Sequence, residues 1–212
     1  MPQAKKIGVD LDDVLLAIIA GLFPWHNRLY GTNNHPDEVR PFELMSSWNC
    51  TKEEAVSRVL DFYQTPEHAA CLPIPGSVEA MRALSQSHEL VIVTSKPADL
   101  EAMTHTWVEK HFPNIFRGIY FTSSFVTPEH KQVKKSELCR KLGLDIFIDD
   151  SVANVLDVAT ACGQVFLFDR PWNQENIALP ANVTRAHSWQ EIVDTISTDR
   201  PPCEHPHELI TL

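Results

Sequence analysis

The feature that most constrains this chain is an apolar run that ends in acidic residues. Residues 7–9 (Ile-Gly-Val) lead directly into Asp10-Leu11-Asp12-Asp13. Side chains two apart on a strand point the same way, so Asp10 and Asp12 would face one crevice while Asp13 is turned aside. A buried carboxylate without a partner is costly, so these acids need a cation, hydrogen-bond donors or open water. The stretch indicates a chemical site, although Asp12-Asp13 could also simply begin a turn.

Length and charge narrow the class of protein. The 212 residues suffice for one domain with a core, or for a core domain with a small insert. A formal net charge of −10 argues against a nucleic acid polymer as partner. No run approaches the roughly 18 apolar residues of a membrane-spanning helix, and the five cysteines are odd in number, as for reduced thiols. We expect a soluble, cytoplasmic protein; its oligomeric state is left open.

Residues 15–75 are expected to form a helical block. Leu15 opens an apolar stretch with helical spacing that runs to Tyr30, and Thr51 with Glu54 fits the capping box of a second helix. Prolines at 73 and 75, followed by Gly76, mark the end of the block.

From residue 76 to about residue 198, amphipathic helices alternate with short apolar strands. The expected strands after the first one lie at 90–93, 119–121, 146–148 and 165–168. Continuous apolar strands separated by helices indicate an α/β fold, here a Rossmann-like parallel sheet of about five strands with helices on both faces. We expect residues 1–14 and 76–198 to form this core, residues 15–75 an inserted helical cap, and residues 199–212 a flexible tail.

Two later strands end in the same polar manner as the first. Residues 90–93 run into Thr94-Ser95-Lys96, and residues 146–148 run into Asp149-Asp150. The carboxyl ends of neighbouring parallel strands meet at one edge of the sheet, where ligands bind. Each group alone could be an ordinary strand-ending hydroxyl or a helix cap. A single shared site accounts for all of them together.

The residue types at these strand ends suit a metal ion and a phosphate. Hard carboxylate oxygens favour Mg²⁺, whereas zinc would prefer His and Cys. The hydroxyl of Thr94 or Ser95 can bond to phosphoryl oxygens, and a lysine can neutralise another. The sequence therefore predicts a Mg²⁺ site that receives a small phosphorylated substrate.

The order of these motifs resembles the haloacid dehalogenase-like superfamily. The resemblance rests on Asp-x-Asp-x-Val at residues 10–14, Thr-Ser at 94–95, a lysine ahead of a helix, and Asp-Asp at 149–150. It covers the chain to about residue 198. Members carry a mobile cap between the first two motifs, and residues 15–75 match that position. The set is most similar to the small 5′-nucleotidase and deoxyribonucleotidase branch.

The resemblance implies a role for each acid. Asp10 would be the nucleophile that forms an aspartyl-phosphate. Asp12 would donate a proton to the leaving oxygen and later take one from water, and an acid there is expected of phosphatases rather than of dehalogenases. The Asp10 carboxylate, the Asp12 backbone carbonyl and Asp150 would hold Mg²⁺, with Asp149 in support.

Three lysines precede the helix that leads to Asp149. They are Lys131, Lys134 and Lys135. We favour Lys135 as the phosphate-binding lysine because it directly enters the helix, as the lysine of this superfamily often does. Charge clustering alone does not separate the three.

Aromatic residues of the expected cap have two interpretations. Phe23, Trp25, Tyr30 and Trp48 could stack on a base, or they could form the cap's own core. His26 and Arg28, close by, could face the substrate or the surface.

The sequence thus predicts a Mg²⁺-dependent phosphomonoesterase that acts on a small phosphorylated metabolite, with a nucleoside monophosphate as one candidate. The alternatives are a catalytically silent phospho-ligand-binding or regulatory module of the same fold, and a phosphotransferase or mutase.

Overall fold

A computed structural model describes residues 4–38, 48–122, 133–174 and 176–198. The expected flexible tail at 199–212 lies outside these residues, as does Lys131. In the described part of the chain, no helix has both the length and the apolar character needed to cross a membrane.

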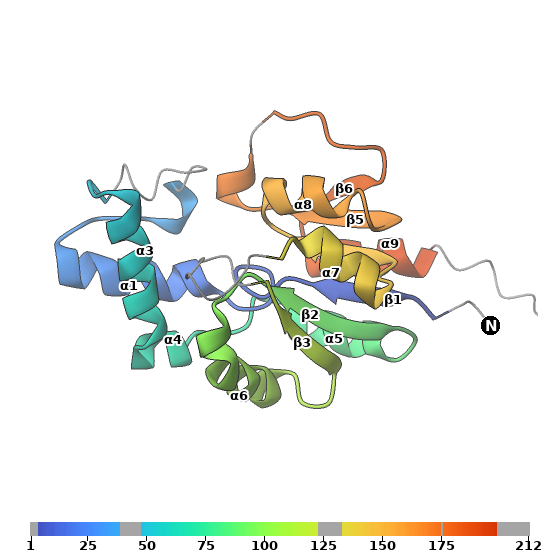
Figure 1. Ribbon diagram of the computed structural model, residues 1–212, viewed down its shortest axis with the longest axis horizontal. Helices are drawn as coiled ribbons and strands as arrows, with labels where there is room; N and C mark the ends of the chain where they lie inside the picture. Colours follow the sequence, from blue (N-terminus) through green and yellow to red (C-terminus); the bar gives the residue numbers. More distant parts are fainter. Residues whose placement is uncertain (1–3, 39–47, 123–132, 175, 199–212) are drawn as a thin grey trace, which may run out of the picture.

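The structure is built on one parallel sheet with the strand order β3-β2-β1-β4-β5-β6 (Figure 1). The strands are β1 (Lys6–Val9), β2 (Glu89–Thr94), β3 (Phe116–Phe121), β4 (Ile146–Asp149), β5 (Gln164–Phe168) and β6 (Val183–Ala186). The chain moves outward from β1 to β3, then crosses back to β4 and moves outward on the other side. The order therefore reverses between β1 and β4, and a ligand crevice forms at such a switch point in doubly wound sheets.

The predicted α/β class is confirmed, with one strand more than expected. The sixth strand, β6, pairs with β5 at the edge of the sheet. Its exposed Thr184 and half-buried Arg185 stand between the buried Val183 and Ala186. Such a short, half-polar edge strand gives a much weaker signal than the apolar runs of the inner strands.

Alternating side chains of the strands bury themselves on opposite faces of the sheet. Leu90 and Ile92 belong to a core cluster that also holds residues of α5 (Ser77–Ser85), α6 (Glu101–His111) and α9 (Trp189–Thr198). Val91 and Val93 belong to the other cluster, under α7 (Lys135–Leu142) and α8 (Val152–Val158). Helices α7 and α8 lie together on one side of the sheet (Figure 1). Both faces are covered, as the continuous apolar strands predict.

The helical insert, defined here as residues 15–75, lies beyond the carboxyl end of β1 (Figure 1). Its described helices are α1 (Ile18–Tyr30), η1 (Pro36–Glu38), α3 (Lys52–Tyr63) and α4 (Pro66–Ala69). The predicted capping box is present: Glu54 N–H donates to Thr51 Oγ1 at 3.2 Å, and Thr51 N–H donates to Glu54 Oε2 at 2.8 Å. Helix α1 begins at Ile18, three residues later than Leu15, and the N–H groups of Leu15 and Leu16 before it both donate to the Leu11 carbonyl.

The two connections between the insert and the sheet are paired with each other. Ala17 N–H donates to the Leu72 carbonyl at 3.0 Å, and Ile74 N–H donates to the Leu15 carbonyl at 2.7 Å. The indole N–H of Trp107, on α6, donates a hydrogen bond to the Cys71 carbonyl at 2.8 Å and so attaches the second connection to the core. The insert therefore leaves and rejoins the core through one short ribbon.

A Gly8→Ala substitution should destabilise the fold, because an added Cβ would come within 2.6 Å of the buried side chains of Phe147 and Leu144. Overpacking of this kind costs about 1–3 kcal/mol. Gly163→Ala is the matched control, since its Cβ would find its nearest neighbour at 3.7 Å. Urea unfolding measures both variants. A Gly8→Ala protein as stable as the control variant would contradict the packing described here.

Candidate functional site

The carboxyl ends of β1 and β4 bring three acidic side chains together. Asp10 directly follows β1, and its N–H donates to the Ile148 carbonyl at 2.9 Å, which continues the pairing of the two strands. Asp10, Asp149 and Asp150 are buried, and one carboxylate oxygen from each lies within 4.8 Å of the others. We refer to these three residues as the acidic cluster.

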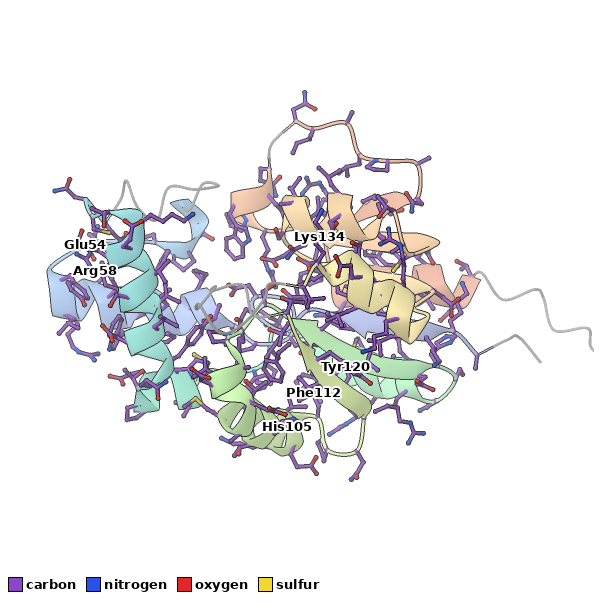
Figure 2. The ribbon with its side chains drawn as sticks, viewed as in Figure 1. Glu54, Arg58, His105, Phe112, Tyr120 and Lys134 are labelled. Carbon is purple, nitrogen blue, oxygen red and sulfur yellow. The ribbon has the colours of Figure 1, made fainter. Side chains whose placement is uncertain are left out.

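Among the lysines that the structure describes, Lys135 reaches the acidic cluster. Its buried Nζ lies 2.8 Å from Asp10 Oδ1 and 2.6 Å from Asp149 Oδ2. Lys134 is the exposed N-cap residue of α7 (Figure 2). Asp149 is held further through Oδ1, which accepts from the backbone N–H of Ser151 at 2.8 Å. The position of Lys135 at the first turn of α7 therefore points it at the strand ends.

Asp150 is held by a loop that sequence reasoning missed. The indole N–H of Trp172 donates to Asp150 Oδ2 at 2.6 Å, and Asn173 Nδ2 donates to the Asp150 carbonyl at 2.8 Å. Both residues belong to η3 (Pro171–Asn173), which follows β5. Their place just after a strand is the signal that could have found them.

The electrostatics of the acidic cluster fit a divalent cation. Burial raises the pKa of Asp10 to about 7; Lys135 opposes that rise, and the charge of Asp149 adds to it. Burial and the charges of Asp149 and Asp10 likewise raise the pKa of Asp150 well above its usual range. Lys135 pairs with only Asp10 and Asp149 of these three acids, and their hard oxygen atoms are the ligands that Mg²⁺ prefers.

Asp12 has a different set of partners. Its Oδ1 lies 2.8 Å from the ammonium of Lys96, and its Oδ2 accepts a hydrogen bond from the Tyr63 hydroxyl at 3.3 Å. Lys96 is buried, and its Nζ also lies 3.4 Å from His68 Nε2. Lys96 follows the Thr94-Ser95 motif directly, which was a usable signal, whereas Tyr63 and His68 carried none.

The two predicted hydroxyl groups both lie at the end of β2. The buried Thr94 accepts the backbone N–H of Lys96 through Oγ1 at 3.2 Å. Ser95 is half-buried, and its hydroxyl accepts from Thr122 Oγ1 at 3.2 Å. Both stay candidates for binding phosphate.

Asp13 serves the insert rather than the acidic cluster. It has a φ of 55°, and its carboxylate accepts the N–H of Ile19 in the first turn of α1 at 3.2 Å. Its carbonyl accepts from Arg170 Nε at 2.8 Å. Burial raises the pKa of Asp13 to about 8.

The aromatic residues of the insert are mainly core residues. Phe23, Trp25 and Trp48 are buried, while Tyr30 is 39% exposed. The ring of His26 stacks on Trp48 at 3.9 Å and on Tyr30 at 4.5 Å between centroids.

Arg28, expected with His26 to face either the substrate or the surface, forms an ion pair with Glu67 at the surface of the insert. Most of the aromatic side chains of the insert therefore pack in its own core, which is one of the two interpretations of the sequence.

Solved structures of known hydrolases share this fold. A haloacid dehalogenase-like hydrolase of Streptococcus pneumoniae superposes with a TM-score of 0.66 at 20% identity, over 92% of this chain and 100% of that one. A D,D-heptose bisphosphate phosphatase of B. bronchiseptica superposes with a TM-score of 0.55 at 15% identity, over 92% and 99%. These similarities confirm the haloacid dehalogenase-like fold that the motifs predict.

A family model narrows this class. The model of the family "5′ nucleotidase, deoxy (pyrimidine), cytosolic type C" matches residues 4–200, and the chain belongs to that family. A protein of Halalkalibacterium halodurans with the provisional name of a nucleotidase is 24% identical over 190 residues, which are 89% of this chain and 91% of that one. A nucleotidase of Clostridium acetobutylicum is 29% identical over 109 residues, or 51% of each chain. The chain is thus a hydrolase of the phosphatase class.

The raised pKa of Asp13 gives stability a pH dependence with a definite sign. Between its ordinary value of 3.8 and about 8, the folded protein keeps a proton that the unfolded chain has released. That contribution to stability is present in full below pH 4 and is lost as the pH rises towards 8. The Asp13→Asn side chain does not titrate, so this variant does not lose stability in this way. The free energy of unfolding of Asp13→Asn, relative to that of wild type, should therefore increase with pH by up to ~1.4 kcal/mol per pH unit.

Urea unfolding between pH 5 and pH 8 measures this difference. Asp99→Asn, which removes an exposed carboxylate, is the control and should follow the wild type. Parallel curves for wild type and Asp13→Asn would refute the assignment.

Proposed function

We propose that this protein is a Mg²⁺-dependent phosphomonoesterase that hydrolyses a nucleoside monophosphate through an aspartyl-phosphate. The observation that carries the proposal is the acidic cluster with Lys135 at the reversal point of the sheet. The family description and the B. bronchiseptica phosphatase, solved with magnesium and phosphate, support it.

Mg²⁺ would be held by the Asp10 carboxylate, the backbone carbonyl of Asp12 and Asp150. When bound, it neutralises charge on the phosphoryl group and offsets the repulsion between that group and the carboxylates. Trp172 occupies Oδ2 of Asp150 and so orients this carboxylate, with Oδ1 left to act as the ligand. Asp149 supports the site because it anchors Lys135.

The reaction has two steps. In the first, an oxygen of Asp10 forms a bond to phosphorus, the bond to the leaving oxygen breaks, and Asp12 gives that oxygen a proton. In the second, water attacks phosphorus, Asp12 takes its proton, and the bond between Asp10 and phosphorus breaks. Thr94 or Ser95, with Lys135, would bind the phosphoryl oxygens throughout.

The helical insert would act as a cap on a core formed by residues 1–14 and 76–198. Its attachment through one paired ribbon suits motion as a unit over the strand ends. The family description names deoxy pyrimidine substrates, so 2′-deoxypyrimidine nucleoside 5′-monophosphates are the first to test. A cytoplasmic location accords with the same description.

Replacing the nucleophile tests the mechanism. Asp10→Asn should lower turnover of a generic aryl phosphate by at least ~10³-fold, because an amide oxygen does not attack phosphorus in its place. The fold should persist by circular dichroism, and Asp99→Asn should retain activity. Undiminished turnover in Asp10→Asn would rule out this nucleophile.

Adding Mg²⁺ tests the metal site. At a Mg²⁺ concentration of about 100 times the dissociation constant, binding adds ~2.7 kcal/mol, or about 5–10 °C in Tm for a chain of this size. Asp150→Asn should shrink the shift, and a chelator should abolish both shift and turnover. Full activity in the presence of the chelator would contradict the assignment of a metal site.

A panel of phosphorylated metabolites, with Mg²⁺ present, tests the substrate class. Nucleoside monophosphates should give the highest kcat/KM, with phosphate released to water. Transfer of phosphate to an added alcohol or sugar instead would identify a phosphotransferase. Binding of phosphate without turnover of any ester would identify a silent module.

A further inference from the structure

A buried lysine outside the acidic cluster contacts the proposed proton donor. Lys96 is only 2% exposed, and its Nζ lies 2.8 Å from Asp12 Oδ1. A buried ammonium is costly unless it is paired, so this ion pair accounts for the burial of Lys96. The Lys96 ammonium is therefore the charged partner of Asp12 Oδ1.

The insert supplies the rest of the surroundings. The Tyr63 hydroxyl, at the end of α3, donates to Asp12 Oδ2 at 3.3 Å, and the same ring lies 4.1 Å from the Lys96 ammonium. His68, on α4, faces the ammonium from another side at 3.4 Å. Burial and the charge of Lys96 lower the pKa of His68 to about 4, so its neutral ring can accept from the lysine.

Both oxygens of the Asp12 carboxylate have a partner. Lys96, which belongs to the core, forms an ion pair with Oδ1, and Tyr63, which belongs to the insert, donates a hydrogen bond to Oδ2. Lys96 is separate from the ammonium that serves the acidic cluster, because Lys135 pairs with Asp10 and Asp149. The lysine is therefore placed to orient Asp12 rather than to neutralise the cluster.

We propose that Lys96 and Tyr63 are positioning residues that hold the Asp12 carboxylate in place for proton transfer to the leaving group. The inference rests on the proposed function and deepens it. Because Tyr63 belongs to the insert, the seated insert completes the surroundings of Asp12. Proton transfer is then efficient only when the insert lies over the strand ends.

Comparing two classes of leaving group separates this role from a structural one. 4-Nitrophenyl phosphate releases a weakly basic oxygen that departs without a proton, whereas an alkyl phosphate releases an oxygen that needs one. The probe is the alkyl phosphate that wild type hydrolyses fastest, a nucleoside monophosphate under the proposed function. Both are assayed with Mg²⁺, and kcat and KM are measured separately.

Loss of a positioned proton donor should selectively lower kcat/KM for the alkyl ester. This constant reports the first step, in which the leaving group departs, whereas the attack of water in the second step is common to both esters. General acid catalysis contributes about 10²–10⁴-fold, so Asp12→Asn should lose at least ~10²-fold more on the alkyl than on the aryl ester. Lys96→Met should lose at least ~10-fold more activity on the alkyl than on the aryl ester, and Tyr63→Phe about 3–10-fold more. Both variants would keep Asp12 but hold it less well.

Lys110→Met, on the exposed face of α6, is the matched control and should lose nothing on either ester. If Lys96→Met fails to fold, Tyr63→Phe tests the inference instead, because it removes only a hydroxyl and keeps the packing of the ring. Equal losses of kcat/KM on both esters, or no loss in either variant, would overturn this inference and leave the proposed function standing. A wild type that hydrolyses neither ester would overturn both.

Discussion

The structure of the site depends on one buried ammonium placed between two buried carboxylates. Lys135 lies between Asp10 and Asp149, and these two acids come from adjacent parallel strands. Without that charge, the close approach of the acids at the ends of β1 and β4 would be strongly unfavourable. The lysine enters from the first turn of α7, so the packing of α7 on the sheet also sets the electrostatics of the crevice.

The parts of the site that the sequence predicts are those that follow from strand geometry. Asp10, Asp149 and Asp150 end apolar strands, and a parallel sheet must bring such ends to one edge. The missed residues depend on the conformation of irregular segments. Tyr63 reaches Asp12 only because of the way the insert folds back, and Trp172 reaches Asp150 through a short loop. No periodicity in the chain encodes either contact.

The insert and the site are joined more closely than their separation in the chain suggests. Asp13 follows the proposed proton donor directly, and its carboxylate holds the N-terminus of α1. Trp107 fastens the other end of the insert through the Cys71 carbonyl. The insert is therefore tied to the core at both of its ends, by Asp13 just after β1 and by Trp107 of α6.

The spacing of Asp10 and Asp12 divides the crevice into two chemically distinct sides. Asp10 joins a cluster formed at the ends of β1 and β4 and pairs with Lys135 of α7. Asp12, two residues on, finds its partners in Lys96 and in the insert. Under the proposed mechanism, changes in the insert would alter the surroundings of the proton donor Asp12, whereas the proposed metal ligands Asp10 and Asp150 lie at the strand ends.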